Sequence, residues 1–462
     1  MNAPVGKVSY PIVMVVILCL GIILSACKAD RNKSLNELDL PPDLSEMELS
    51  ADRLEIWWDD RFGVPYDEYA LGHLRRKYTE TTFDVRNFHF FMNVHSSTGE
   101  SDLFHMLRTK PSPDLIVFDI QLLPLLIESG YLDPIHISTG YYDMDSSVIE
   151  QIRSIASDGE LYAMPYGYSP SALIYNKAIF DEMEVEYPRD GMTWDEVFEL
   201  AGRVADQSRW NALDVSNYDL VTSQLSLRLI NPSTQQIDFE SESWMKLEEF
   251  FTQLKSLQSQ DREEKEKYNR MTAFANGRTA MLAGLLFDDM SNTKGLYNRA
   301  TEYGLSDVDW DIVRFPVFDD GLAPAKHMLL IGVPRAGVNK DDALIAMKYL
   351  LSHEVQDGHT RKGLISLRAD MAPEVFAEEL DFMIGRSKRA FIHPAPVGRF
   401  DPDLDSLPVI DLKIDSSIDL PLSYPAEHAI AWIKEETTAE LRQYMDIRQR
   451  LIEELKGKYG WE

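Results

Sequence analysis

Two pairs of neighbouring carboxylates are the residues whose types and spacing best suit acid–base chemistry. They are Asp59-Asp60 and Asp288-Asp289. Enzymes that cleave glycosidic bonds use two carboxylates about 5–9 Å apart, a distance that a sequence does not give. A glycoside-active enzyme is therefore kept as an alternative. A nucleophilic serine is not indicated, because Gly167-Tyr168-Ser169-Pro170-Ser171 has serine where a nucleophile elbow has its second glycine.

The sequence also lacks the spacings that hold metals and phosphate-bearing cofactors. Its ten histidines are scattered and form no H-E-x-x-H pair. Aspartates alternate at 307–311 and 401–405, but the sixth position of a calcium loop requires glycine and is here Ile312 or Ser406. Neither the P-loop nor the dinucleotide-binding glycine pattern occurs. We expect neither a metal nor a cofactor.

Composition limits the class of protein and the class of partner. Hydrophobic residues make up 44% of the 462 residues, which is ample for packed cores in two or three domains. The chain holds 46 Lys and Arg against 76 Asp and Glu, a formal charge of −30. A field of that sign repels phosphate backbones, so we expect no nucleic-acid partner. It is compatible with a neutral or cationic small molecule, and we further expect a monomer.

The N-terminus has the pattern of an export signal. The apolar run Ile12–Leu24 is shorter than the roughly 20 residues of a membrane-spanning helix and has the length of a secretory signal core. It ends in Leu24-Ser25-Ala26-Cys27, which resembles the lipobox of bacterial lipoproteins. The alternatives are an ordinary signal peptide or an uncleaved anchor. We expect a signal peptide over residues 1–26, acylation of Cys27 with fatty chains such as palmitate, and a flexible tether over 27–51 that holds the protein on the outer face of the cell membrane.

Strand and helix patterns alternate along the body of the chain, which is typical of an α/β sheet covered by helices on both faces. In the first part we expect strands at 53–58, 83–91 and 115–118, and helices at 66–79, 102–108 and 121–129. In the second part we expect strands at 171–176, 312–316 and 328–333, and helices from Thr193 and at 273–282, 341–351 and 426–455.

Several segments resemble the family 1 extracellular solute-binding proteins of ABC importers. The similarity covers about residues 54–363, and residues 369–420 are interpreted as an insertion whose role is not assigned. The segments that carry it are SPDLIVFDIQLLPLLIESGYLDPI at 112–135, GELYAMPYGYSPSALIYNK at 159–177, TWDEV at 193–197, FANGRTAM at 274–281 and the helix within 333–356.

The resemblance implies a two-lobe periplasmic-binding-protein-like fold of type II, with hinge crossings and a central ligand cleft. Lobe one would hold 52–164 and 311–352, and lobe two would hold 165–310 and 353–462. The implied function is not catalysis: a lipid-anchored receptor captures a small molecule, which we expect to be a sugar or oligosaccharide, and delivers it to the transmembrane subunits of an ABC permease. A ligand-binding sensor for a signalling receptor is the alternative.

Sugars present apolar faces that stack on aromatic rings and hydroxyl groups that bind carboxylates. Ligands of open α/β sheets lie at the carboxyl ends of strands. Trp57, Trp58 and Asp59 end the first expected strand, and Asp119 ends the 115–118 strand. We place these four residues in the expected ligand site.

Four further site residues follow from the resemblance alone. Tyr166 and Tyr168 lie at the presumed hinge, and Phe287 and Asp288 follow the helix that ends in Ala-Met, where the family often has an aromatic ligand contact. Core packing is the alternative for each aromatic residue. Because side chains alternate along a strand, one of Trp57 and Trp58 is expected to point inward.

Overall fold

The structure is a computed structural model, and every structural statement below concerns the residues that it describes. These are 47–59, 66–88, 102–136, 144–168, 171–216, 218–227, 230–231, 236–237, 239–257, 270–285, 308–319, 321–324, 328–371, 383–391 and 426–460.

The first sheet has five strands in the order β2-β1-β3-β11-β4. The strands are β1 (Arg53–Asp59), β2 (Thr82–Phe88), β3 (Leu115–Asp119), β4 (Met164–Tyr168) and β11 (Met328–Gly332). β1 pairs in parallel with β2 and β3, and β11 is antiparallel to both β3 and β4. The carboxyl ends of β1, β2, β3 and β4 therefore lie at the same edge of the sheet.

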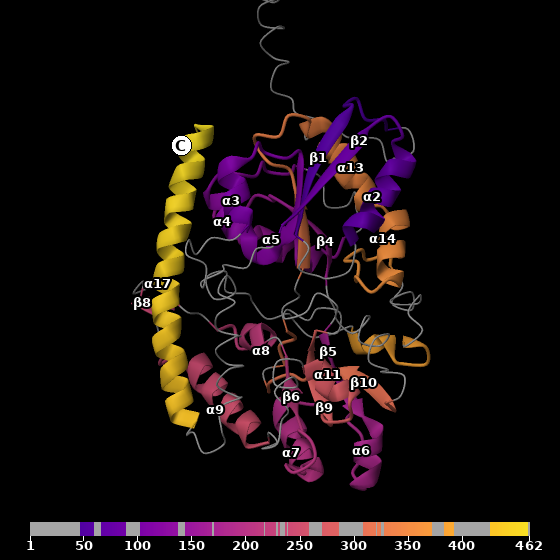
Figure 1. Cartoon of the computed structure of the whole chain (residues 1–462), viewed down its shortest axis with the longest axis vertical. Coiled ribbons are helices and arrows are strands. Elements are labelled where there is room, and N and C mark those ends of the chain that lie inside the picture. Colours follow the sequence, from indigo (N-terminus) through magenta and orange to yellow (C-terminus); the bar gives the residue numbers. More distant parts are fainter. Residues whose placement is uncertain are drawn as a thin grey trace, which may run out of the picture.

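Helices cover this sheet on two sides (Figure 1). α2 (Tyr66–Lys77) packs with α13 (Lys340–Leu350) and α14 (His353–Arg361) on one side. On the other side lie α3 (Asp102–Thr109), α4 (Leu123–Glu128) after the short helix η3 (Ile120–Leu122), and α5 (Ser146–Arg153). The buried carboxylate of Asp114 accepts hydrogen bonds from the backbone N–H groups of Glu55, Val338 and Asn339, so it ties the start of β3 to β1 and to the start of α13.

The second sheet has four strands in the order β10-β5-β9-β6. They are β5 (Ser171–Asn176), β6 (Asp214–Val215), β9 (Met281–Leu285) and β10 (Trp310–Arg314). β5 is antiparallel to both neighbours, and only β6 and β9 pair in parallel. The helices of this half are α6 (Lys177–Glu182), α7 (Trp194–Val204), α8 (Tyr218–Gln224), α9 (Glu242–Ser256) and α11 (Arg270–Ala275), and β7 (Ile230–Asn231) pairs separately with β8 (Gln236–Ile237).

The expected helix at 273–282 is wrong in its extent. α11 ends at Ala275, and Gly277 adopts a positive φ of 69° that only glycine takes up easily. The chain then turns and enters β9 at Met281. The apolar residues after the glycine therefore lie in a strand, although their spacing also fits a helix.

The described residues include three places where the chain passes from one sheet to the other. One is the step from β4 to β5, and another is the segment from β10 to β11. A third follows α14, where Tyr168 and Ile365 exchange two backbone hydrogen bonds of 2.9 and 3.0 Å before η8 (Lys388–Phe391) packs on β10 and β5.

Sheet membership differs from the expected lobe boundaries at three elements. β10 lies within the expected 311–352 part of lobe one but pairs in the second sheet. β4 and α14 fall in the expected lobe two, yet β4 pairs with β11, and α14 packs on α2. The reason is that the chain crosses later than the resemblance implied, after β10 and after Ile365.

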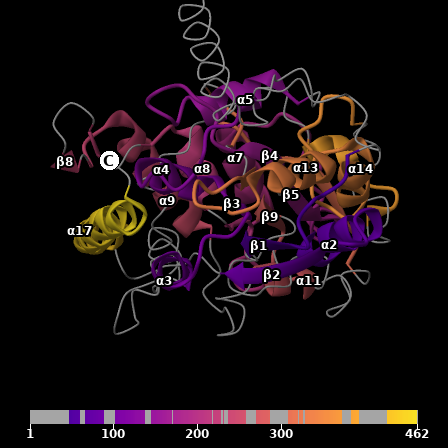
Figure 2. The ribbon, with the colours of Figure 1, turned by 90° about the horizontal axis from the view of Figure 1, so that it is seen from above.

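The longest helix, α17 (Ala426–Tyr459), confirms the helix expected at 426–455. It contacts α3 and α4 beside the first sheet and α9 beside the second. Ile447, Leu451, Ile452 and Leu455 are buried in the C-terminal half of the helix. Figures 1 and 2 show it running past both sheets, on the side of the molecule opposite α2 and α14.

Candidate functional site

The two tryptophans at the end of β1 are both buried. Trp57 is 0% exposed, and its indole N–H donates to Glu55 Oε1 at 3.0 Å. Trp58 is 3% exposed, and its ring meets the ring of Tyr166 edge-on at 5.3 Å. Core packing, the alternative that we gave for these rings, therefore describes Trp57 well. Trp58 lies on the other face of β1, and its ring contacts β4 through Tyr166.

Two buried carboxylates end adjacent strands at the same edge of the first sheet. Asp59 closes β1 and is 1% exposed, and Asp119 closes β3 and is 2% exposed. Asp119 caps η3, because its Oδ1 accepts the backbone N–H of Gln121 at 2.9 Å. The strand register pairs Trp58 with Val117, and both aspartates follow shortly after this pair. The sequence thus placed both carboxylates at the carboxyl ends of parallel strands.

The two tyrosines of β4 are also buried, and the register of β4 against β11 shifts next to Tyr166. Tyr166 is 0% exposed, and its hydroxyl lies 3.1 Å from both ring nitrogens of His359. Tyr168 is 7% exposed and forms the backbone bridge to Ile365 at the crossing. Burial, with a smaller contribution from the charge of Asp145, raises the pKa of the Tyr168 hydroxyl, which therefore stays protonated at neutral pH.

His359 and Tyr69 extend this cluster, and sequence reasoning missed both. The ring of His359 lies 5.1 Å from Tyr166 and 4.6 Å from Tyr69, and Tyr69 lies 4.6 Å from His73. A row of rings thus runs from Trp58 at the end of β1 to α2. The sequence feature that could have pointed to this packing is Gly358, a glycine inside a helix. A Cβ added at Gly358 would lie 1.5 Å from the Tyr69 hydroxyl.

Three expected functional residues, Cys27, Phe287 and Asp288, lie outside the described residues. The same holds for most of the interpreted insertion at 369–420. Within the described ranges no three His, Cys, Asp or Glu side chains are grouped in a way that suits a metal ion. None of the helices described there has the length and apolar character needed to cross a bilayer.

The second lobe has its own buried charge pair. Asp214, 1% exposed on β6, lies 3.7 Å from the guanidinium of Arg270 on α11. Its carboxylate also accepts hydrogen bonds from Asn211 at 3.0 Å and Thr279 at 3.3 Å. Because these partners fix α11 and β9 against β6, we assign the pair a structural role.

A family model described as "Bacterial extracellular solute-binding protein" matches residues 77–381, well over half of the chain. The chain belongs to this family. As a solute-binding protein it works outside the cytoplasm, and the family and the solved neighbours are binding proteins of transporters, which sets aside the glycoside-active enzyme.

Solved structures confirm the two-lobe fold of this solute-binding protein. A sugar transporter protein from Rhizobium etli in an open conformation has a TM-score of 0.61 at 18% identity, over 84% of this chain and all of that one. A solute-binding protein from Thermotoga lettingae bound with α-D-tagatose has a TM-score of 0.58 at 20% identity, over 85% of this chain and all of that one. The GacH receptor of Streptomyces glaucescens gives 0.57 at 17% identity, over 85% and 99%.

One relative found by sequence comparison matches only part of this chain. The sn-glycerol-3-phosphate-binding periplasmic protein of Agrobacterium fabrum is 23% identical over 155 residues, which is 32% of this chain. The match spans about a third of that relative, 35% of its length.

Proposed function

We propose that this solute-binding protein captures a sugar or oligosaccharide between its two lobes and delivers it to an ABC permease. The observation that carries the proposal is the agreement of fold with neighbours that were solved with sugar ligands, tagatose and acarbose among them. The crossings near Tyr168 and Ile365 support a hinge between the lobes. In such a protein the ligand shifts the population toward a closed form, because only the closed form makes contacts from both lobes.

The proposed ligand groups of the first lobe are Asp59 and Asp119, with Trp58, Tyr166 and Tyr168 beside them. Carboxylates at strand ends accept hydrogen bonds from sugar hydroxyls, and aromatic rings stack on the apolar sugar face. We keep Phe287 and Asp288 as proposed contacts from the second lobe. Trp57, whose indole N–H donates to Glu55 on the face of β1 opposite Trp58, supports the strand from within the core in this proposal.

Substitutions of Asp119 test the proposed ligand site. Asp119→Ala should weaken sugar binding by about ten- to hundred-fold, since a lost hydrogen bond to a charged acceptor costs roughly 1.5–3 kcal/mol. Asp119→Asn should cost less, because an amide oxygen still accepts and asparagine still caps η3. A thermal-shift screen of mono- and oligosaccharides finds the ligand, and calorimetric titration of each variant measures its affinity.

The matched control is Asp206→Asn. Asp206 also accepts the backbone N–H two residues on, from Ser208 at 3.2 Å, but it lies in a turn of the second lobe. It should bind sugar like the parent. If Asp119→Ala also binds like the parent, the site assignment is wrong. If the screen finds only sugar-free ligands, the carbohydrate proposal fails while the importer-receptor proposal stands.

Attachment to the membrane through Cys27 is part of the proposal. Cleavage before Cys27 and acylation of its thiol would attach the protein to the outer face of the cell membrane, since two or three acyl chains bury enough methylenes for stable anchoring. Mass spectrometry of the N-terminal peptide from native membranes should find a lipid-modified Cys27. A peptide that begins at Met1, or an unmodified Cys27, contradicts this attachment.

A further inference from the structure

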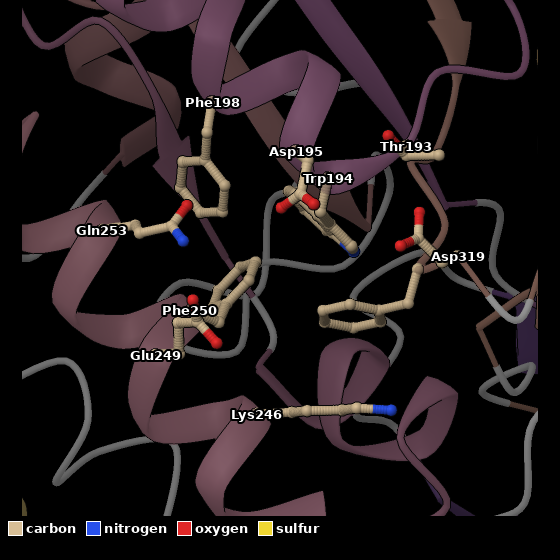
Figure 3. Close-up of a pocket in the computed structure, with 10 residues that line it drawn as sticks. Thr193, Trp194, Asp195, Phe198, Lys246, Glu249, Phe250, Gln253 and Asp319 are labelled. Atoms are coloured by element: carbon tan, nitrogen blue, oxygen red, sulfur yellow. The ribbon is translucent and has the colours of Figure 1, made fainter.

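A cavity of ≈ 200 Å³ lies in the second lobe, between α7, α9 and the segment that follows β10. None of its lining residues belongs to the first sheet or to the ligand site proposed above. Figure 3 shows aromatic rings around the cavity and charged side chains at its margin. Neither the family nor the proposed function gives it a role.

Four aromatic residues form the walls. The ring of Phe250 lies 4.8 Å from Trp194, 5.2 Å from Phe198 and 6.0 Å from Phe318. Phe198 and Phe318 are only half-buried, so their rings remain accessible from the cavity. The indole N–H of Trp194 already donates to Gln224 Oε1 at 3.0 Å. The walls therefore offer ring surface and no free indole donor.

The margin of the cavity is negatively charged. Asp195, Glu249 and Asp319 are exposed lining residues, and no Lys, Arg or His of the described chain forms an ion pair with any of them. Lys246 is the single basic residue among the described lining residues, and its ammonium group lies 3.1 Å from Glu242. The described lining thus holds three carboxylates and one ammonium group, and the ammonium group already has a partner.

The N-terminal end of α7 does not offset the negative charge at the margin of the cavity. Thr193 and Glu196 form a capping box: the Thr193 hydroxyl accepts the N–H of Glu196 at 3.2 Å, and Glu196 accepts the N–H of Thr193 at 2.9 Å. Two backbone donors at this helix start are therefore already used, because the N–H of Glu196 donates to Thr193 and the N–H of Trp194 donates to the carbonyl of Val317 at 2.8 Å.

We propose that this cavity binds a small organic cation, namely an alkylammonium or quaternary ammonium group. The negative face of an aromatic ring attracts such a cation, and the attraction grows as water is removed from it. The surrounding carboxylates add a longer-range attraction and exclude anions. The proposal is independent of what occupies the site between the lobes.

The test compares choline with its neutral isostere 3,3-dimethyl-1-butanol, which has the same shape without the charge. Titration of the full chain followed by NMR should show choline binding at least ten-fold more tightly than the isostere. Phe318→Leu keeps apolar volume but removes a ring face, so it should weaken choline binding about ten-fold. Its thermal midpoint should stay near that of the parent, which separates loss of the ring from loss of the fold.

Charge variants test the margin independently of packing. Glu249→Gln with Asp319→Asn should weaken choline binding several-fold, and Lys246→Met should strengthen it. Sugar affinity should stay unchanged in all of these variants. Equal binding of choline and its isostere overturns the proposal, as does unchanged choline binding in both Phe318→Leu and the double charge variant. Competition between choline and the sugar would also overturn it, because it would place the cation between the lobes.

Discussion

The lowered pKa of His73 on α2 makes the stability of the folded protein depend on pH. Burial is the main cause that lowers its pKa below 6.5, Arg76 lowers it further, and Glu354, 3.7 Å from Nδ1, raises it. The folded state thus favours the neutral ring, while the unfolded chain takes up a proton near pH 6.5. The resulting stability is present above that pH and is lost as the pH falls below it.

His73→Gln should therefore make the free energy of unfolding depend less steeply on pH between 7 and 5. Glu354→Gln should make it steeper, because it removes a charge that raises the pKa of His73. Urea unfolding at a series of pH values measures both slopes. A parent-like slope in His73→Gln would show that this ring does not titrate as described.

The candidate site shows which residue-level features a sequence can predict. The positions of Asp59 and Asp119 follow from local strand patterns and from the rule that parallel strands end at one edge. The contact between Tyr166 and His359 joins residues 193 positions apart, and no local pattern encodes it. Likewise, alternation alone predicts one buried tryptophan on β1, whereas packing against segments distant in the sequence buries both.

Among the elements, α14 and α2 pack so closely that one position between them requires glycine. A Cβ on Gly358 would lie 1.5 Å from the hydroxyl of Tyr69 and 2.5 Å from its ring carbon. Gly358→Ala should therefore lower the free energy of unfolding by about 1–3 kcal/mol through overpacking, although alanine favours helix. Chemical denaturation measures it, and adding Tyr69→Phe should recover part of the loss.

Gly457→Ala is the matched control, since this glycine also lies inside a helix, α17, and a Cβ added to it would meet no atom within 4 Å. It should leave stability unchanged or raise it by up to about 1 kcal/mol. Equal effects of the two substitutions would mean that α14 and α2 separate without cost.

Element types were predictable where the apolar period was long and clear. β1, β2, β3 and β11 of the first sheet and α17 follow from such patterns, whereas β4 was not expected as a strand. The order of the strands and the antiparallel pairing of β5 with β9 and β10 depend on contacts between distant segments. The turn at Gly277 was missed because a period of 3.6 and a short apolar strand share the same residues.

At the scale of the whole molecule, the C-terminal half of α17 is firmly attached beside the first sheet. Leu451 and Leu455 are 0% exposed there, Arg448 pairs with Glu128 at 2.7 Å, and Arg108 pairs with Glu454. Leu451→Ala should cost about 2–5 kcal/mol of unfolding free energy, because it leaves a cavity in this contact.

Met445→Ala on the same helix is the control: its side chain is 37% exposed, so the change should cost less than about 1 kcal/mol. Thermal and urea unfolding compare the two variants. If Leu451→Ala is as mild as Met445→Ala, the C-terminal half of α17 is not part of the cooperative core.

The other half of α17 reaches the second lobe, where Lys434 pairs with Glu248 and lies 5.7 Å from the centre of the Phe239 ring. A helix of 34 residues is about 51 Å long and resists compression along its axis. It therefore spans one side of the molecule at a nearly constant length. If the lobes open and close as proposed, a helix attached to both would limit their separation on its own side, so that the opening would be wider on the opposite side, where α2 and α14 lie.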